Sequence, residues 1–502
     1  MLRSAPATSS KCTELQVSVP RLLVAGLSGG GGKTLLSLGL AASFRSRGQI
    51  VAPFKKGPDY IDAAWLTRAA HRPCRNLDLF LFDSSVVLRS FQANSADADL
   101  AIIEGNRGLF DGMDPEGSFS SAELAKLLKA PVLLSVDVTK TTRTAAAQVL
   151  GCQTLDPEVH LAGVVLNRVA GARHEAILRE TIEGICGIPV LGAIPRVKED
   201  PFPERHLGLV PPQETDEVEG PIAKVREVAE RYLDLEGILS LAKAASSSPV
   251  GRERNGRKVQ VHFKDGPENP PQAEASEGPE RGTPKPRIGV FRDSAFQFYY
   301  PENLEHLVEA GGTLLEVSPL QDANLPDVDA LYLGGGFPET LATGLSGNLP
   351  FMKSLREAVA EGLPVYAECG GAVYLGEALH YQGDTFPMVG VLPVNYGFQG
   401  KPSGHGYTVL EAIRENPFFP VGQTLRGHEF HYTYMLPLEA EDLTFAFRVH
   451  RGYGFNGEHD GICRGSVLAL YTHVHALGTV DWAPALVGKA VEYRSSGGGG
   501  QE

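Results

Sequence analysis

Residues 21–36 read RLLVAGLSGGGGKTLL, an apolar run that enters a glycine-rich turn and then a helix-favouring segment. The tripeptide Gly32-Lys33-Thr34, placed between a strand and a helix, is the core of a phosphate-binding P-loop. Backbone N–H groups and the helix N-terminus would surround the phosphates, Lys33 would neutralise them, and the Thr34 hydroxyl could bind Mg²⁺. A glycine-rich turn alone is often structural, but this placement favours nucleotide binding. The residues expected to contact the nucleotide here are Gly29, Gly30, Gly31, Gly32, Lys33 and Thr34.

Apolar runs alternate with helix-period segments beyond this loop. The runs are short and continuous, as expected of parallel strands that are buried on both faces. They are RLLVAGL, QIVAPFK, LAIIEG, PVLLSVDV, LAGVVLN and PVLGAIP. The alternation predicts a doubly wound α/β domain with a parallel sheet over residues 21–242, after a disordered lead-in at 1–20.

The composition changes after residue 242. Residues 243–286 are rich in Pro, Gly, Ser and mixed charge, so we expect a flexible linker there. The strand–helix pattern restarts at RIGVFRD (287–293), and later segments such as HGYTVLEA and FAFRVHRG favour additional strands. A second α/β domain is therefore expected over 287–490, followed by a flexible tail at 491–502.

The length, charge and composition argue against several classes of protein. A chain of 502 residues is too long for a single core, and a formal net charge of −14 argues against a general nucleic-acid-binding protein. The six cysteines form no CxxC pair, which fits a reducing compartment and argues against a zinc site. The start of the chain lacks the apolar segment of a signal peptide, and no apolar run reaches the length of a membrane span. We therefore expect a soluble, cytoplasmic protein that does not act at a membrane.

Polar side chains follow several of the predicted parallel strands. Asp59 and Asp62 come after QIVAPFK, Glu104 ends LAIIE, and Asn167 ends VVLN. The carboxyl ends of parallel strands meet at one edge of a sheet, so these side chains should lie near the P-loop. A solvated loop carboxylate is the usual explanation of one Asp or Glu, but this convergence favours a metal site. Asn167 is expected to contact adenine.

The stretch VYAECGG at 365–371 brings Cys369 to the end of another predicted strand. A nucleophile on a sharp strand-to-helix turn would need small neighbours, and a helix N-terminus favours the thiolate. A buried cysteine that only fills space is the alternative, and it is the more common situation for a lone cysteine.

Several segments in order resemble the cobyrinic acid a,c-diamide synthase family. In the first domain they are FKKGPDYID, HRPCRNLD, EGNRGLFDG, LNRV and the loop itself, which has Gly26 where strict spacing would put glycine at position 27. This shifted loop is similar to that of dethiobiotin synthetase and of partitioning ATPases. In the second domain the segments are LGGGFPE, YAECGG, RGHEFHYTY and YTHVHALG. The resemblance covers about 21–242 and 286–490, and the long linker and Asn106-Arg107 depart from the family pattern.

The resemblance implies a dethiobiotin synthetase-like ATP-binding domain followed by a glutamine amidotransferase domain. It implies a carbon–nitrogen ligase that uses ATP and L-glutamine to amidate the a and c carboxylates of cobyrinic acid, a corrinoid tetrapyrrole, through acyl phosphates in cobalamin biosynthesis. It also implies that the strand-end acids are functional. We place Thr34, Asp59 and Glu104 around Mg²⁺, with Asp62 and Asp111 binding metal or orienting substrate.

In the amidotransferase half, the resemblance assigns Cys369 as the nucleophile that attacks the glutamine amide carbon. The N–H of Gly370 and one from the segment 335–337, for which we take Gly336, would form the oxyanion hole. Relatives with a full triad have His followed two residues later by Glu, so His473 is the expected base. His475 then stands where the carboxylate would be, which suggests a Cys–His dyad and leaves open what orients His473.

Other readings of these residues are kept open. His428 and His431 in RGHEFHY are rival bases, although this segment is expected to shape the site or contact the macrocycle. The same chemistry could act on hydrogenobyrinic acid or on nickel sirohydrochlorin. A partitioning-type P-loop ATPase switch and a binding protein on a decayed scaffold are alternatives of a different class. A homodimer is one expectation for the assembly.

Overall fold

The protein was analysed as a computed structural model, which describes residues 18–196, 204–205, 208–215, 218–246, 285–436 and 443–497. The chain divides into two compact units. The N-terminal unit comprises residues 1–79, 84–209 and 217–264, and the C-terminal unit comprises 80–83, 210–216 and 265–502. The predicted lead-in, most of the predicted linker and the last residues of the predicted tail lie outside the described residues.

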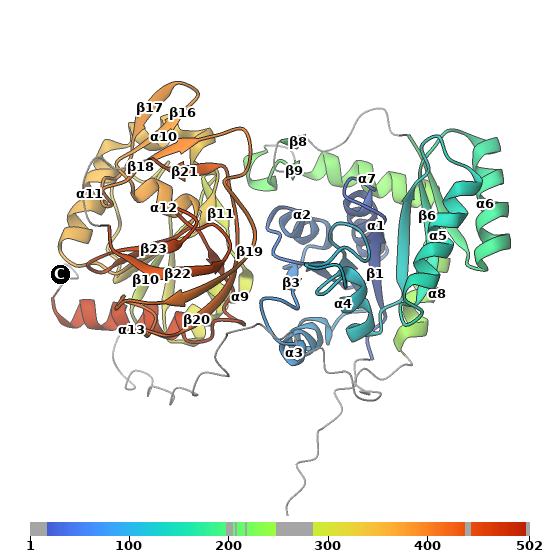
Figure 1. Cartoon of the computed structure of the whole chain (residues 1–502), viewed down its shortest axis with the longest axis horizontal. Coiled ribbons are helices and arrows are strands. Elements are labelled where there is room, and N and C mark those ends of the chain that lie inside the picture. Colours follow the sequence, from blue (N-terminus) through green and yellow to red (C-terminus); the bar gives the residue numbers. More distant parts are fainter. Residues whose placement is uncertain are drawn as a thin grey trace, which may run out of the picture. The chain divides into compact units, whose positions relative to one another are not determined.

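The N-terminal unit is built on a seven-stranded sheet in the order β3-β2-β4-β1-β5-β6-β7 (Figure 1). Every neighbouring pair in it is parallel. The strands are β1 Arg21–Gly26, β2 Val51–Lys56, β3 Arg75–Leu77, β4 Leu100–Glu104, β5 Val132–Asp137, β6 Leu161–Val169 and β7 Val190–Pro195. This confirms the predicted doubly wound parallel sheet. Strand order reverses at β1, so the loop after β1 lies at the switch point where such sheets bind ligands.

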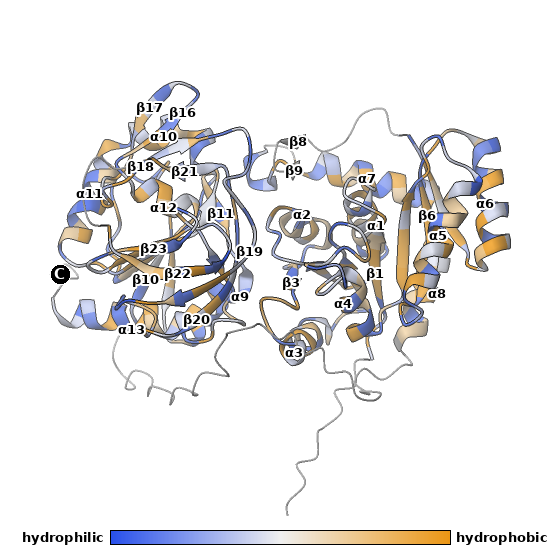
Figure 2. Cartoon of the chain, viewed as in Figure 1, coloured by the Kyte–Doolittle hydropathy of each residue, from blue (hydrophilic) through white to orange (hydrophobic). Residues whose placement is uncertain are grey.

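Helices connect these strands and cover the sheet. They are α1 Lys33–Ser46, α2 Ile61–Ala70, α3 Ser84–Ser95, α4 Ser121–Leu128, α5 Arg143–Leu155, α6 Ala172–Cys186, α7 Glu219–Tyr232 and α8 Leu235–Ser246. A short antiparallel pair, β8 Glu204–Arg205 and β9 Gly208–Leu209, precedes the 3₁₀ turn η1 Pro212–Glu214. The strands around β1 are coloured mainly as hydrophobic, whereas α6 alternates hydrophilic and hydrophobic stretches (Figure 2). The central strands are therefore buried on both faces, as their continuous apolar sequences predict.

The C-terminal unit has a ten-stranded mixed sheet in the order β12-β10-β13-β15-β24-β23-β22-β19-β20-β25. Its parallel part contains β10 Arg287–Phe291, β12 Thr313–Val317, β13 Ala330–Leu333, β15 Val365–Glu368 and β24 Val467–Leu470. Its antiparallel part contains β19 Gly404–Ala412, β20 Thr424–His431, β22 Phe445–Arg451, β23 His459–Arg464 and β25 His473–Val474. The predicted second α/β domain with added strands is confirmed.

Smaller elements complete the C-terminal unit. The helices are α9 Pro301–Glu309, α10 Ala342–Gly347, α11 Leu349–Ala360, α12 Gly370–Leu375 and α13 Trp482–Ser495, with the 3₁₀ turn η2 Pro338–Leu341. The pair β11 Phe296–Phe298 and β14 Gly335–Gly336 is separate from the main sheet, as is the four-stranded sheet of β16 Ala378–Tyr381, β17 Asp384–Pro387, β18 Asn395–Phe398 and β21 Thr433–Met435. Residues 491–495 were expected in the flexible tail but form the last turn of α13.

The main sheet of the C-terminal unit curls, and this curl positions the candidate base. Only Tyr471 and Thr472 separate β24, in the middle of the sheet, from β25, which pairs with the last long strand β20. Three Cα–Cα steps join residues 470 and 473, so the two strand ends are at most about 11 Å apart. The far end of the sheet must therefore return to the carboxyl end of β24, which is also the end of its neighbour β15.

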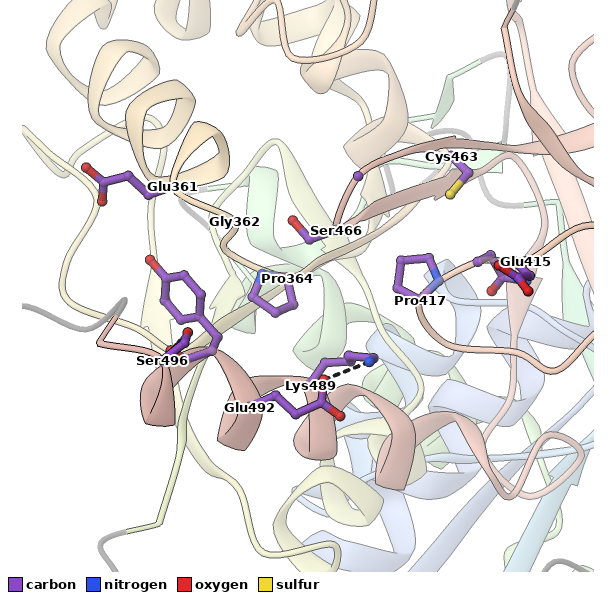
Figure 3. Close-up of a pocket in the computed structure, with 13 residues that line it drawn as sticks. Glu361, Gly362, Pro364, Glu415, Pro417, Cys463, Ser466, Lys489, Glu492 and Ser496 are labelled. Atoms are coloured by element: carbon purple, nitrogen blue, oxygen red, sulfur yellow. Dashed lines mark hydrogen bonds and ion pairs between the residues drawn. The ribbon is translucent and has the colours of Figure 1, made fainter.

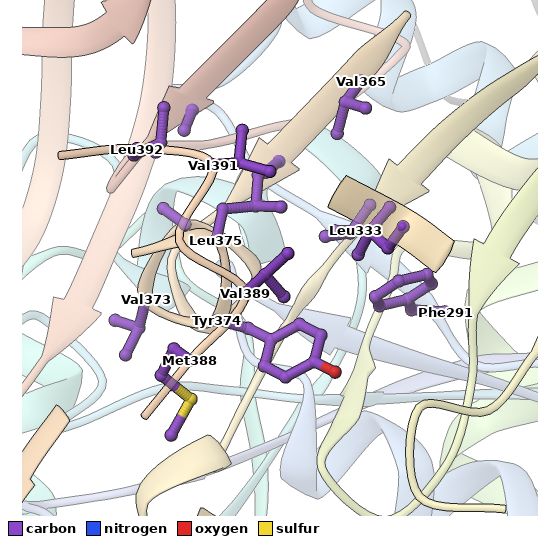
Figure 4. Close-up of a cluster of buried hydrophobic side chains, with 14 of the residues drawn as sticks. Phe291, Leu333, Val365, Val373, Tyr374, Leu375, Met388, Val389, Val391 and Leu392 are labelled. Atoms are coloured by element: carbon purple, nitrogen blue, oxygen red, sulfur yellow. The ribbon is translucent and has the colours of Figure 1, made fainter. Parts of the chain in front are cut away.

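Successive side chains of the parallel strands point to opposite faces of the sheet, so the core of the C-terminal unit has two layers. Leu333, Val365 and Ala367 belong to one cluster, part of which Figure 4 shows packed around α12. Tyr332 and Tyr366, one position out of step with them, belong to the other cluster. Successive strand residues point to opposite faces, so the residue that follows Ala367 shares the face of Tyr366.

Among the described residues, no helix combines the length and apolar character that crossing a membrane would require.

Close packing of α1 on α7 depends on a glycine. A Cβ added at Gly39 would lie 2.8 Å from the Val225 carbonyl oxygen and 2.9 Å from the Ala229 Cβ. We expect Gly39→Ala to force the helices apart and to lower the free energy of unfolding by about 1–3 kcal/mol, measured by urea denaturation followed by circular dichroism.

Gly184→Ala in α6 is the matched control, since nothing lies within 4 Å of its added Cβ. That helix-interior change should stabilise by about 0.5–1 kcal/mol. Equal effects of the two variants would contradict the packing argument.

Candidate active sites

The loop after β1 folds as a tight phosphate-binding turn. Gly30 and Gly32 have φ values of 70° and 85°, a conformation that glycine adopts without strain. Lys33 begins α1 and bends back over the loop, where its Nζ donates a 2.8 Å hydrogen bond to the Ser28 carbonyl oxygen. The N-terminal amides of α1 have no side-chain cap, which leaves the helix end suited to an anion.

Two side chains from neighbouring strands brace the loop. Ser135 and Asn167, near the ends of β5 and β6, donate hydrogen bonds of 2.7 and 3.3 Å to the Gly31 carbonyl oxygen. A Cβ added at Gly32 would lie 2.2 Å from Asn167 Nδ2, so only glycine fits there. Asn167 therefore lies beside the phosphate loop, and its contact with adenine stays a prediction.

The strand-end acids gather around a lysine that the sequence reading left without a role. Lys55, the residue before the last in β2, has its Nζ 2.6 Å from Asp62 Oδ2 and 2.8 Å from Glu104 Oε1. The Thr34 hydroxyl donates to the same Glu104 oxygen at 2.7 Å and lies 3.5 Å from Asp62 Oδ2. Asp59 is more remote, since its Oδ2 is 4.0 Å from Lys55 Nζ. A lysine inside a buried strand is rare without an acidic partner, and that was the signal available in the sequence.

Burial and mutual charge set the protonation of this cluster. Burial would lower the pKa of Lys55, but Asp62 and Glu104 outweigh it and raise that pKa well above its ordinary value. Burial would raise the pKa of Asp62, yet the adjacent Lys55 brings it below the ordinary range. For Glu104, burial outweighs the attraction of Lys55 and raises the pKa to about 7. Burial and the charge of Asp62 raise the pKa of Asp59 to about 6.

The donor set fits a hard divalent cation, although the acids are not pre-arranged as a cage. Hydroxyl and carboxylate oxygens are the ligands that Mg²⁺ prefers. Glu104 Oε2 is buried and has no hydrogen-bond partner among the described residues. Among the residues that the structure describes, no group of three or more His, Cys, Asp or Glu side chains is arranged to hold a metal ion. Asp62 lies nearer to Thr34 and Glu104 than Asp59 does, which differs from the order expected from the sequence.

Asp111 lies at the edge of this site. Its Oδ2 accepts a 2.8 Å hydrogen bond from the Gly108 N–H, and the residue is exposed. Burial and then Lys55 lower the pKa of Lys33, which the charges of Glu104, Asp62 and Asp111 partly oppose. Asp111 is thus close enough to act on the P-loop lysine, while its side chain stabilises its own turn.

Cys369 occupies a strained turn between β15 and α12. Its φ of 48° and ψ of −104° are unusual for a residue with a side chain, and such conformations concentrate at functional sites. The turn is possible because Gly370 and Gly371 follow. A Cβ added at Gly371 would lie 2.7 Å from Leu333 Cβ, and one added at Gly370 would lie 3.1 Å from the Gly336 nitrogen.

The predicted oxyanion-hole segments do approach each other. The backbone of Gly336 lies against Gly370, the residue that follows Cys369. Phe337 is excluded as the second donor, because its N–H donates to the Ala295 carbonyl oxygen at 3.1 Å. Gly336 stays the predicted second donor.

The thiol of Cys369 is held in an electronegative environment. Burial raises the pKa of Cys369 well above its usual range, and the charges of Glu339, Glu368 and Glu429 raise it further. The hydrogen bond from the Gly370 N–H opposes this shift. These surroundings disfavour the thiolate, so a base is needed to take the thiol proton.

His473 lies against the glycine segment that packs on the cysteine turn. A Cβ added at Gly335 would lie 2.5 Å from His473 Cε1, so the imidazole covers the glycine segment that also packs on Gly370. His473 Nδ1 is 3.5 Å from Glu368 Oε2. Sequence reasoning gave Glu368 no role. His475, which stands at the sequence position of the triad carboxylate, lies outside β25, and its Nε2 is 3.7 Å from Glu302 Oε2. The Cys–His dyad stays a prediction.

The rival histidines have other surroundings. His428 is the β20 residue paired directly opposite His473. His431 Nδ1 is 2.8 Å from the Thr433 carbonyl oxygen, and its ring stacks on Tyr471 with centroids 3.7 Å apart. His431 Nε2 is 3.5 Å from Glu429 Oε2. Of these three histidines, His473 is the one that lies on the glycine segment beside Gly370.

A pocket of about 660 Å³ lies elsewhere on the C-terminal unit. Figure 3 shows its lining, which includes Pro364, Ser466 and Lys489. Pro364 and Ser466 precede β15 and β24, whereas Cys369 follows β15, so four strand residues or about 13 Å separate the two places. The pocket therefore lies at the amino-terminal ends of β15 and β24, and the cysteine turn lies at the carboxyl end of β15.

Comparison with known proteins agrees with the two sites. Residues 22–209 match the CobQ/CobB/MinD/ParA nucleotide binding domain, and residues 287–480 match the CobB/CobQ-like glutamine amidotransferase domain. A cobyrinate a,c-diamide synthase of Magnetococcus marinus is 43% identical over 468 residues, covering 93% of this chain and 96% of the relative. Proteins of the same name from Archaeoglobus fulgidus and Syntrophotalea carbinolica are each 39% identical, covering 95% and 91% of this chain and 99% and 96% of the relatives. The chain thus contains both a P-loop unit and a cysteine–histidine unit, and the relatives match it over nearly their whole length. The chain belongs to the cobyrinate a,c-diamide synthase family.

Proposed function

We propose that this chain amidates the a and c carboxylates of cobyrinic acid, using ATP and glutamine, as a step of cobalamin biosynthesis. The observation that carries the proposal is the presence in one chain of two chemical centres. One is a P-loop beside strand-end acids, and the other is a strained cysteine beside His473. The names of relatives that match nearly the whole chain supply the substrate.

The N-terminal unit would make a carboxylate reactive. A carboxylate does not react with ammonia because oxide is a poor leaving group, whereas an acyl phosphate readily loses phosphate. Forming it from ATP requires in-line positioning and neutralisation of charge. Lys33 and the amides of the loop supply both, since they converge at the N-terminus of α1.

Mg²⁺ is the cofactor that these residues fit. Thr34, Asp62 and Glu104 would hold it, and Asp59 and Asp111 would bind metal or orient the substrate. When bound, Mg²⁺ neutralises charge on the phosphate oxygens. Lys55 keeps the two nearest acids together beside Thr34, because its Nζ contacts both at less than 3 Å.

The C-terminal unit would release ammonia from glutamine. His473 takes the proton of the Cys369 thiol as the sulfur attacks the amide carbon, and the N–H groups of Gly370 and Gly336 would stabilise the oxyanion. The proton then passes to the amide nitrogen, ammonia leaves, and water hydrolyses the thioester. The released ammonia must stay unprotonated, because ammonium has no lone pair with which to attack the acyl phosphate.

We also infer a cytoplasmic location. The five cysteines among the described residues are not joined in disulfides, as is usual in a reducing compartment. A homodimer stays a prediction, which light scattering on the purified chain would measure.

The direct test is mass spectrometry of cobyrinic acid incubated with the chain, ATP, Mg²⁺ and glutamine labelled with ¹⁵N in the side-chain amide. We expect two successive acid-to-amide mass changes that carry the label. Hydrogenobyrinic acid and nickel sirohydrochlorin, tested in parallel, distinguish the alternative substrates. Amidation of one of these but not of cobyrinic acid would overturn the substrate assignment.

Cys369→Ser should lower glutamine-dependent amidation by about 10³-fold or more, because the thiol that accepts the acyl group is gone. Activity with added ammonium salt should persist. Cys152→Ser, on α5 of the N-terminal unit, is the control that should retain both activities. Loss of both activities in Cys369→Ser would show that the cysteine is needed for the fold.

Lys33→Ala should reduce amidation by about 10²-fold or more, with either nitrogen source, since phosphate charge is left without its cation. Glutamine hydrolysis should continue at a measurable level. Lys224→Ala, an exposed position on α7, should behave like the parent in both assays. Normal amidation by Lys33→Ala would remove the P-loop lysine from the mechanism.

A further inference from the structure

We infer that Glu368 is the positioning residue for His473, and that its carboxylate takes the part of the acid that the sequence His473-Val474-His475 lacks. The inference rests on the proposed roles of Cys369 and His473 in glutamine hydrolysis. It concerns a residue that lies next to the nucleophile in the chain and was expected only to end a strand.

The location of Glu368 follows from strand alternation. Glu368 is the last residue of β15, and its side chain shares the sheet face of Tyr366, as two residues of separation require. One carboxylate oxygen, Oε2, lies 3.5 Å from His473 Nδ1. That separation is longer than an optimal hydrogen bond, but catalytic contacts are often loose before substrate binds.

The carboxylate is held rigidly by neutral donors. Oε1 accepts hydrogen bonds from the Val474 N–H at 3.0 Å and from the Tyr366 hydroxyl at 3.2 Å. Oε2 accepts one from the Tyr332 hydroxyl at 3.1 Å. Burial, followed by the charge of Glu368, raises the pKa of both tyrosines well above its usual value, so the hydroxyls remain donors. Glu368 thus binds the backbone beside His473 with one oxygen and presents the other to the imidazole.

A second brace fixes the same short segment. Asn303 on α9 donates from Nδ2 to the Val474 carbonyl oxygen at 2.9 Å and accepts at Oδ1 from the Ala476 N–H at 2.7 Å. Together with Glu368, it sets the backbone on both sides of residue 475. The backbone that carries His473 therefore cannot move away from Glu368 without breaking these bonds.

The charge arrangement gives this contact a chemical purpose. Among the described residues, Glu368 forms no ion pair with Lys or Arg, and His473 is the basic side chain that it faces. A carboxylate at Nδ1 favours the tautomer with hydrogen on Nδ1, which leaves the Nε2 lone pair available for the thiol proton. When Nε2 takes that proton, the imidazolium forms beside a fixed negative charge that stabilises it.

Other carboxylates are assigned elsewhere. Glu302 faces His475, whose ring lies 4.4 Å from that of Tyr300. Glu429 faces His431 and accepts from the N–H groups of Tyr453 and Gly454 at 2.6 and 2.9 Å. Glu368, whose Oε2 lies 3.5 Å from His473 Nδ1, is the carboxylate that we assign to His473.

The test is Glu368→Gln, which preserves size and whose amide oxygen can still accept from the Val474 N–H and the Tyr366 hydroxyl, while its NH₂ group takes the place of Oε2. We expect kcat for glutamine hydrolysis to fall about 10²–10⁴-fold, the usual contribution of an oriented acid–base group, with KM changed less than about threefold. ATP- and ammonium-dependent amidation should stay within about twofold of the parent, which shows that the fold is intact. In ¹⁵N-histidine spectra, assigned with His473→Asn, the His473 signal should shift from the Nδ1–H tautomer toward a mixture.

Two matched variants separate positioning from packing. Tyr366→Phe removes one donor but keeps the charge, and Glu302→Gln neutralises the carboxylate that faces His475. Both should retain kcat within about fivefold and leave the His473 signal unchanged. If Glu368→Gln does not fold, Glu368→Asp replaces it, and we expect a lowered kcat with the Nδ1–H tautomer retained.

A Glu368→Gln variant with parental kcat and tautomer would overturn the inference, as would a loss of kcat matched by Glu302→Gln. The proposed function fails separately, since that failure would appear as a parent chain that hydrolyses no glutamine and amidates no corrinoid.

Discussion

In each unit a carboxylate is buried at the carboxyl end of a parallel strand, and the cost of burying that charge determines what surrounds it. Removing an ionised carboxylate from water costs several kcal/mol unless cations and hydrogen-bond donors replace the water. Glu104 at the end of β4 is contacted by Lys55 and Thr34. Glu368 at the end of β15 is contacted by two tyrosine hydroxyls, a backbone N–H and His473. The groups that make these acids tolerable are the same groups that give the two sites their chemistry.

Sheet topology decides which groups are available. Lys55 and Glu104 are register partners on adjacent parallel strands, so their meeting needs nothing beyond the pairing of β2 with β4. His473 reaches Glu368 by a longer route, because the antiparallel strands must curl back before β25 can pair with β20. A one-residue slip of β15 would turn Glu368 to the opposite face and separate it from His473. The register of a short inner strand thus fixes the environment of the candidate base.

This difference explains how much could be predicted from the sequence. The P-loop, the parallel sheet and the approach of Glu104 to Thr34 follow from local patterns and from the rule that strand ends share an edge. The role of Lys55 could not be predicted, although the residue stands inside the motif FKKGPDYID. A strand pattern does not show which charged side chains are buried together. Glu368 was missed because its partner lies more than 100 residues away and arrives through sheet curvature, which periodicity does not encode. The alignment of His475 with a triad acid compared sequence positions, whereas orientation depends on which carboxylate faces the ring.

The electrostatics of Cys369 add a reason for a fixed acid at His473. Burial and the charges of Glu339, Glu368 and Glu429 raise the pKa of the thiol, which disfavours the thiolate. A thiol in this state resists oxidation and stray alkylation, because both reactions require the thiolate. The same charges oppose the reaction unless the proton leaves together with the attack on the amide carbon. In the proposed mechanism the positive charge that then forms on His473 lies beside Glu368. The same carboxylate, after burial and Glu339, contributes to the raised pKa of the thiol and would stabilise the ion pair that replaces it.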